Sequence, residues 1–175
     1  MEKPLPHFTY ITDAYARTVF LKNTITCDCC RQESRYHYDG PFYTAAEGEI
    51  ALCPWCIHDG SAAAKYDASF NDLYGKSLAE AVVTAVCEQT PGYSSWQDQT
   101  WATHCRDACV YHGEATAQDV AGANEQSRQQ WMRDYGQDAE SWAHFMDGYQ
   151  PGGDQGVYKF CCRHCGLVVF NWDFS

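Results

Sequence analysis

The pattern of hydrophobic and polar residues predicts short strands and short helices, and therefore an α+β fold. Phe8 and Tyr10 alternate with polar neighbours, which favours a half-buried strand near the start of the chain. β-Branched and aromatic residues at 24–26 and 36–38 predict two further strands, joined through a turn at 27–30. The first third of the chain should therefore contain a hairpin whose turn carries cysteines.

A second cysteine turn follows, and after it the pattern becomes helical. The apolar run at 50–52 predicts a strand that leads into Cys53-Pro54-Trp55-Cys56, and residues 61–66 are rich in alanine, which favours a helix. Further on, Trp101, Cys105 and Cys109 recur at steps of four, which predicts one stripe of a helix. These elements form a predicted helical middle, whose start signals are Ser77 with Glu80, Ser95 with Asp98, and Thr116 with Asp119.

The last fifty residues predict exposed helices and then a hairpin. Residues 124–147 are polar with a few aromatic anchors, which indicates one or two helices broken near Gly136. Residues 157–174 place β-branched and aromatic side chains on both sides of a cysteine turn, with Gly166 just after it. We therefore expect the chain to end in an antiparallel hairpin.

The length of 175 residues predicts one domain. The two halves meet between Tyr66 and Ser77 without a long linker. We therefore expect residues 1–175 to form a single integrated domain, with approximate sub-modules at 1–70 and 71–175.

Charge excludes several classes of partner. The chain has 12 Lys and Arg against 23 Asp and Glu, a net charge of −11. Nucleic acids and anionic lipids attract positively charged surfaces, so we expect binding to neither. No apolar run approaches the roughly 18 residues of a membrane span, and the first residues lack the apolar segment of a secretory signal. A cytoplasmic protein without membrane association is the resulting expectation.

The 11 cysteines carry most of the chemical information. An odd number cannot pair completely within one chain, and a chain of this length does not need disulfides to fold. Clustered cysteines at short spacing, in a reducing compartment, indicate metal binding or catalysis. The spacing of the cysteines therefore decides what cofactor to expect.

The first set of candidate ligands consists of two C-x2-C pairs, Cys27 with Cys30 and Cys53 with Cys56, separated by 22 residues. Two such turns supply the four thiolates of a tetrahedral Zn²⁺ site. A hairpin that offers one pair and a helix start that offers the other resemble a treble-clef finger, and Cys29 is an alternative ligand in the first turn. Cys53-Pro54-Trp55-Cys56 before a helix also resembles the dithiol of a thioredoxin-like redox protein, which is the rival interpretation.

The second set consists of Cys105 with Cys109 and Cys162 with Cys165. Residues four apart on a helix share a face, and the sequence CRHCG is typical of the turn in a zinc knuckle. This set predicts a second site, and hence two Zn²⁺ per chain. Alternative ligands in this part of the chain are His104, His112, His164 and Cys161.

Several motifs together resemble the CbrC-like family of small bacterial proteins, whose prototype is described as a colicin tolerance protein. They are PLPHFTY, CDCC, DGPFY, LCPWCIHDGSAA, TPGYSSWQ, W-x2-HC-x-D-x-C and CRHCG, and they extend over nearly the whole chain. The chain departs from the family pattern at position 161, where a cysteine is not expected. The resemblance implies an intracellular, zinc-containing protein and supplies no reaction.

These observations predict a treble-clef-like zinc module, a helical middle and a C-terminal zinc-knuckle hairpin. Sites with four protein ligands are structural rather than catalytic, because no coordination position stays open. We therefore expect a zinc-binding, non-enzymatic binding or adaptor protein in a bacterial stress or toxin-tolerance context, with a protein or a small molecule as partner. The alternatives are an enzyme with a pocket near Trp96 and Asp107, and a thiol redox protein that uses Cys53 and Cys56.

Overall fold

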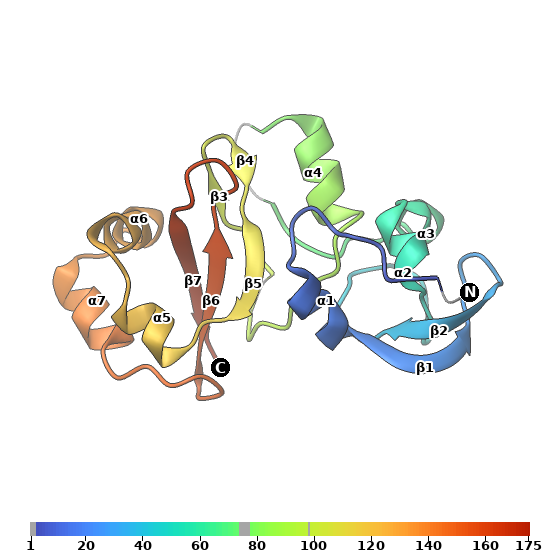
Figure 1. Cartoon of the computed structure of the whole chain (residues 1–175), viewed down its shortest axis with the longest axis horizontal. Coiled ribbons are helices and arrows are strands. Elements are labelled where there is room, and N and C mark those ends of the chain that lie inside the picture. The colour runs from blue at the N-terminus through green and yellow to red at the C-terminus, as the bar shows by residue number, and fades with distance from the viewer. Residues whose placement is uncertain (1–2, 74–77, 98) are drawn as a thin grey trace. The chain divides into compact units, whose positions relative to one another are not determined.

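The computed structural model describes residues 3–73, 78–97 and 99–175. It has an α+β architecture, and the chain divides into two compact units, Met1–Ser94 and Ser95–Ser175. This division falls later than the sub-module boundary at 70/71 that the sequence suggested, and the single integrated domain stays a prediction. Figure 1 shows the elements of each unit.

The first unit is built around a two-stranded antiparallel hairpin. Strands β1 and β2 pair from Phe20 with Tyr38 to Thr26 with Glu33, with an irregularity between Lys22 and Ile25. Among the residues described there, four short helices complete the unit. The elements are α1 (Asp13–Val19), β1 (Phe20–Thr26), β2 (Glu33–Tyr38), α2 (Pro54–His58), α3 (Ser61–Tyr66) and α4 (Glu80–Cys87).

An aromatic core fills the first unit. The ring of Phe20 lies 5.5 Å from those of both Phe8 and Tyr38, and the Tyr38 ring lies 5.6 Å from that of Phe70. The Tyr38 hydroxyl donates to the Pro41 carbonyl at 2.7 Å and accepts from the Gly92 amide at 2.9 Å. A Cβ at Gly92 would lie only 2.5 Å from the Phe70 carbonyl oxygen, so the residues after α4 return to this core through a position that only glycine fits.

The second unit contains a three-stranded antiparallel sheet in the order β5-β6-β7 and a small separate hairpin, β3–β4. Three helices connect β5 to β6 in sequence. The elements are β3 (Thr103–His104), β4 (Asp107–Ala108), β5 (Val110–Glu114), α5 (Ala117–Ala121), α6 (Glu125–Tyr135), α7 (Ala139–Met146), β6 (Gln155–Cys161) and β7 (Val168–Phe174).

The two faces of this sheet bury different aromatic groups, because side chains alternate along a strand. Val157 and Phe170 join a core cluster with Trp131 and Trp142, which come from α6 and α7 on that face. Phe160 instead packs against Trp101 and Tyr111, at ring distances of 5.3 and 5.0 Å. Both faces of the sheet are therefore occupied by buried rings.

The structure confirms most of the predicted elements. The hairpin predicted at 24–38 is present as the longer pair β1–β2, and the one predicted at 157–174 is present as β6–β7. The predicted helix at 61–66 is α3, and the capping box of Thr116 with Asp119 is formed. The helical stretch at 124–147 is broken at Gly136, which has a φ of 61° and ends α6. Ser77 and Asp98, which belong to two other predicted helix starts, lie outside the described residues.

Three predicted elements are wrong. The apolar run at 50–52 does not form a strand but is irregular chain that leads into α2. Phe8 and Tyr10 are buried but lie in irregular chain ahead of α1, so their alternation reflects packing and not a strand. Residues 101–109 do not form a helix but the β3–β4 hairpin, whose turn residues Cys105 and Arg106 have φ values of 53° and 60°. That turn lacks the Asn-Gly or Asp-Gly pair that normally signals such a hairpin, so local propensity could not reveal it.

In the described part of the chain, no helix combines the length and apolar character that crossing a bilayer requires.

Candidate metal centres

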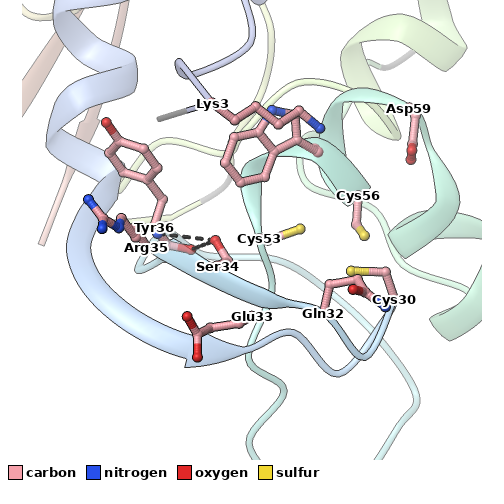
Figure 2. Close-up of a pocket in the computed structure, with 11 residues that line it drawn as sticks. Lys3, Cys30, Gln32, Glu33, Ser34, Arg35, Tyr36, Cys53, Cys56 and Asp59 are labelled. Carbon is pink, nitrogen blue, oxygen red and sulfur yellow. Dashed lines mark hydrogen bonds between the residues drawn. The ribbon is translucent and has the colours of Figure 1, made fainter. Parts of the chain in front are cut away.

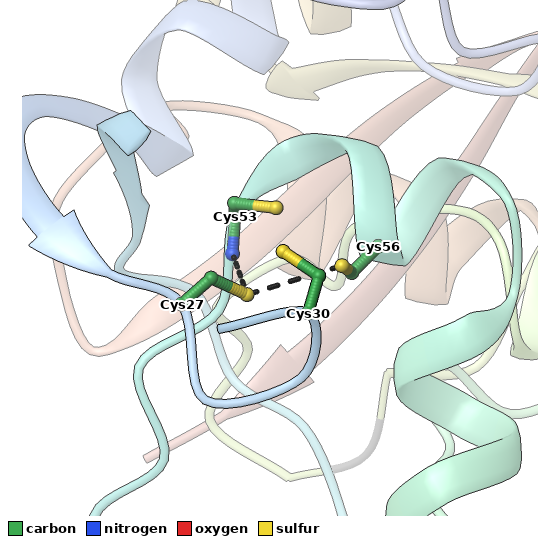
Figure 3. Close-up of side chains that lie close together, drawn as sticks. All are labelled: Cys27, Cys30, Cys53 and Cys56. Carbon is green, nitrogen blue, oxygen red and sulfur yellow. Dashed lines mark hydrogen bonds between the residues drawn. The ribbon is translucent and has the colours of Figure 1, made fainter. Parts of the chain in front are cut away.

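The first cluster, defined as Cys27, Cys30, Cys53 and Cys56, brings four sulfur atoms together within 4.8 Å of one another. Cys27 and Cys30 lie in the turn after β1, and the other two lie at the start of α2. Figure 3 shows all four side chains directed toward one point. The structure thus brings together the whole first set that the sequence predicted.

Asp28 connects the two halves of this cluster. Its backbone N–H donates to the Ala51 carbonyl at 2.8 Å, and its Oδ2 accepts from the Ala51 N–H at 2.9 Å. Its Oδ1 also accepts from Arg31, whose φ of 61° closes the cysteine turn. Pro54 then occupies the first turn of α2, where a missing N–H costs nothing, and so fixes the entry of the second cysteine pair.

The donor set fits Zn²⁺. Zn–S bonds of about 2.3 Å in a tetrahedron separate two sulfurs by about 3.8 Å, and the sulfurs of Cys27 and Cys56 are 3.9 Å apart. The structure also favours one thiolate: a hydrogen bond with the Cys53 thiol lowers the pKa of Cys27 to about 4, against the opposing effect of burial.

Two other thiols of this cluster, those of Cys53 and Cys56, resist ionisation in the absence of a cation. The hydrogen bond with Cys27 raises the pKa of Cys53. Burial raises the pKa of Cys56 to about 12. A divalent cation would remove this opposition by neutralising the accumulated negative charge. Four such thiols around one point are therefore suited to a metal dication.

The second cluster consists of His104, Cys105, Cys162 and Cys165, whose ligand atoms also lie within 4.8 Å of one another. His104 Nδ1 lies 3.2 Å from Cys105 Sγ and 3.3 Å from Cys165 Sγ, and these two sulfurs are 3.9 Å apart. Cys105 and Cys165 are exposed and only Cys162 is buried, whereas in the first cluster Cys30 alone is exposed. One imidazole and three thiolates form a common zinc donor set.

Cys109, which the sequence placed in this set, is not part of the cluster. It lies beyond the β3–β4 hairpin and is fully buried, and its carbonyl accepts a hydrogen bond from the Trp101 indole at 2.8 Å. The sequence-based choice required a helix, on which residues four apart share a face. The hairpin instead presents His104, which had been an alternative ligand, beside Cys105.

A tight turn between β6 and β7 supplies the other two ligands. The Cys162 N–H donates to the Leu167 carbonyl and the Gly166 N–H donates to the Cys162 carbonyl, at 2.8 and 3.0 Å. Gly166 has a φ of 73°, which glycine adopts without strain. Burial opposes ionisation of Cys162, but backbone N–H groups of Cys165 and His164 outweigh it and lower the pKa of Cys162 to about 6.

Asp107, named from the sequence only for the alternative enzyme pocket, connects the two turns of the second cluster. This largely buried carboxylate accepts from Arg163 at 3.1 Å and lies 2.9 Å from His164 Nε2. Both partners lie between Cys162 and Cys165 in sequence. The β3–β4 hairpin and the C-terminal turn are therefore held together by contacts that involve no metal.

The remaining cysteines and histidines that the sequence raised as ligands lie outside both clusters. Cys29 Sγ lies 3.6 Å from the Ser61 hydroxyl oxygen, and Cys161 Sγ lies 3.6 Å from the Gly166 carbonyl oxygen. His112 and His164 are also outside the second cluster. Trp96, named for the alternative enzyme pocket, is largely exposed.

Comparison with known proteins relates the whole chain to a family without assigned function. A family model described as "Uncharacterised protein family (UPF0167)" matches residues 5–174. The UPF0167 protein PA1536 of Pseudomonas aeruginosa is 40% identical over 179 positions, which cover 100% of both chains. The UPF0167 protein Mb2317 of Mycobacterium bovis is 33% identical over 98% of this chain and 94% of its own length. No solved structure matches the chain.

Proposed function

We propose that this chain, which belongs to the UPF0167 family of uncharacterised proteins, is a zinc-stabilised binding or adaptor protein rather than an enzyme. The observation that carries the proposal is the pair of clusters, each with four nitrogen or sulfur donors within 4.8 Å. Four protein ligands complete a tetrahedron and leave no position for a substrate, as in structural zinc sites.

Each zinc has a distinct structural part in this proposal. The first cluster, with a hairpin turn on one side and the start of α2 on the other, is consistent with a treble-clef-like module. The second cluster lies between two tight turns and is consistent with a pair of zinc knuckles. The C-terminal turn of this pair is the knuckle hairpin that the sequence predicted. Two Zn²⁺ per chain are required.

The cellular setting that we propose is the bacterial cytoplasm, in stress or toxin tolerance, as the resemblance to the CbrC-like family implies. All 11 cysteines are free thiols in the structure, which suits a reducing compartment. The net charge of −11 supports partners other than nucleic acids and anionic membranes.

Metal and thiol counts test this proposal against the redox and enzyme alternatives. The protein is purified without chelator under non-oxidising conditions, and zinc is measured per chain by elemental analysis. Seven of the 11 cysteines lie in the clusters, so a thiol reagent should label at most the other four until a chelator is added. Fewer than two zinc ions contradicts the proposal.

The same samples distinguish a thiol redox protein. Such a protein should show Cys53 and Cys56 as a reactive pair that forms a disulfide reversibly before any chelator is added. For the enzyme alternative, Asp107 is already occupied by Arg163 and His164, which favours a structural role for that carboxylate.

A further inference from the structure

A cavity of about 650 Å³ lies against the first cluster, within the first unit. Small-molecule sites typically have volumes of about 300–1,000 Å³. Figure 2 shows its walls: the segment that carries Lys3, strand β2 and the start of α2, with three of the cluster's cysteines at one side. The cavity is therefore large enough for a small organic ligand.

An aromatic wall defines one side of this cavity. Trp55 of α2 and Tyr36 of β2 meet edge to face, with ring centroids 6.2 Å apart. The ammonium group of Lys3 lies 4.4 Å from the centroid of the Trp55 ring. The face of an indole attracts cations through its quadrupole. The Trp55 ring is therefore a cation-binding surface in this cavity, and the Lys3 ammonium group occupies it.

The charges around the cavity also favour a cation. Among the side chains that line it, Lys3 and Arg35 are offset by Glu33 and Asp59. The balance is then set by the first cluster, because Cys30, Cys53 and Cys56 also line the cavity. One Zn²⁺ with four thiolates carries a net charge of about −2. The cavity would therefore have a negative potential beside an aromatic surface.

We infer that this cavity binds a small alkylammonium compound, whose charged group takes the position over Trp55 that Lys3 holds. The inference deepens the proposed function and rests on it, since the cluster supplies the negative charge when it holds zinc. Lys3 acts as an internal competitor that fills the site in the absence of ligand. A ligand must displace it, which makes the lysine a determinant of affinity.

Three probes of similar shape and different charge test the inference on the full-length zinc-loaded protein. They are choline, 3,3-dimethyl-1-butanol and 3,3-dimethylbutanoate, which carry a positive, a zero and a negative charge. Binding is followed by NMR at the Trp55 indole N–H, assigned with Trp55→Phe. We expect choline to bind about tenfold more tightly than the alcohol, and the carboxylate to bind most weakly.

Matched variants locate the site. Trp55→Leu keeps an apolar side chain and should abolish the preference for choline over the alcohol. Lys3→Ala removes the competitor and should tighten choline binding, whereas Lys3→Arg keeps a cation and should not. Trp96→Leu changes an exposed tryptophan of the second unit and should leave binding unchanged.

Equal binding of the three probes, preference for the carboxylate, or no choline binding overturns the inference, whatever the metal content. Zinc is counted in the same samples and decides the proposed function separately. A protein with two zinc ions and no choline binding would therefore retain the proposed function and lose only this inference.

Discussion

At the scale of single residues, the two clusters differ in the protection of their ligands. In the first cluster only Cys30 is exposed, whereas in the second only Cys162 is buried. An exposed thiolate–zinc bond is open to chelators and to water, while burial excludes both. A chelator should therefore remove the second zinc more easily than the first, and the ligands of the second zinc are the ones that substitution tests first.

His104, rather than Cys109, is expected to be the fourth ligand of the second zinc. His104→Ala should reduce zinc from two ions per chain to one, and His104→Cys should restore the second ion because thiolate also binds zinc. Cys109→Ala should keep both ions, since this side chain is buried outside the cluster. Elemental analysis after gel filtration measures the outcome; loss of zinc in Cys109→Ala with retention in His104→Ala would reverse the assignment.

Asp119 should make the stability of the second unit sensitive to acid. Burial opposes ionisation of the Asp119 carboxyl. The Lys159 ammonium group, whose Nζ lies 2.5 Å from Asp119 Oδ1, and the cap interactions with Thr116 outweigh the effect of burial. They lower the pKa of Asp119 below the usual range. A lowered pKa in the folded state gives stability that is present above the ordinary value of about 3.9 and is lost as the pH falls through the folded value.

We therefore expect Asp119→Asn to cost about 1 kcal/mol of unfolding free energy at pH 7, a modest value because the ion pair is about a quarter exposed. The difference from the unsubstituted protein should shrink as the pH falls below about 3.9, because the unfolded chain takes up this proton first and the folded aspartate does so only at lower pH. Urea unfolding at several pH values measures both. Glu125→Gln, at the exposed start of α6, serves as the control, and a cost independent of pH would contradict the argument.

At the scale of elements, the second cluster depends on how two turns are held together. Neither the β3–β4 hairpin nor the β6–β7 turn can present four ligands alone, and they lie far apart in sequence. The Asp107 carboxylate joins them through Arg163 and His164. The ligands are thereby positioned before metal binds, and such supporting contacts contribute to metal affinity.

Asp107→Ala should weaken zinc binding at the second cluster by about 10- to 100-fold, although Asp107 belongs to neither cluster. Competition with a chromophoric chelator measures the affinity, and the first cluster provides an internal reference that should not change. Asp107→Asn keeps an acceptor without the charge and should have a smaller effect. Unchanged affinity in Asp107→Ala would show that the ligands need no such support.

At the scale of the whole molecule, each compact unit contains one cluster. The first cluster lies within Met1–Ser94 and the second within Ser95–Ser175. Small modules have little core of their own, so bound metal supplies much of their folding free energy. Loss of either metal should therefore destabilise its own unit first.

Cys56→Ser should lose the first zinc and loosen the first unit, while the second zinc stays bound. Cys165→Ser should lose only the second zinc and free the C-terminal hairpin, which raises proteolysis in the loop at 150–156. Limited proteolysis with zinc counting on both variants measures this. Cys29→Ser, which changes a thiol outside the clusters, should behave like the unsubstituted protein. Simultaneous loss of both metals from Cys165→Ser would refute the independence of the sites.

The sequence by itself determined the features that depend on neighbouring residues. The C-x2-C spacing placed pairs of thiols on single turns, the capping box of Thr116 with Asp119 started α5, and Gly136 ended α6. Each of these is local, because a turn or a helix end is specified by residues within one or two turns of chain.

Only the tertiary structure decided which local features meet. His104 replaced Cys109 because residues 101–109 gain more from pairing and from burying Trp101 than from helix propensity. The cavity beside the first cluster combines Lys3, Tyr36 and Trp55, which share no sequence motif. Contacts between distant segments follow from how the whole chain buries its apolar surface, and no local spacing encodes that.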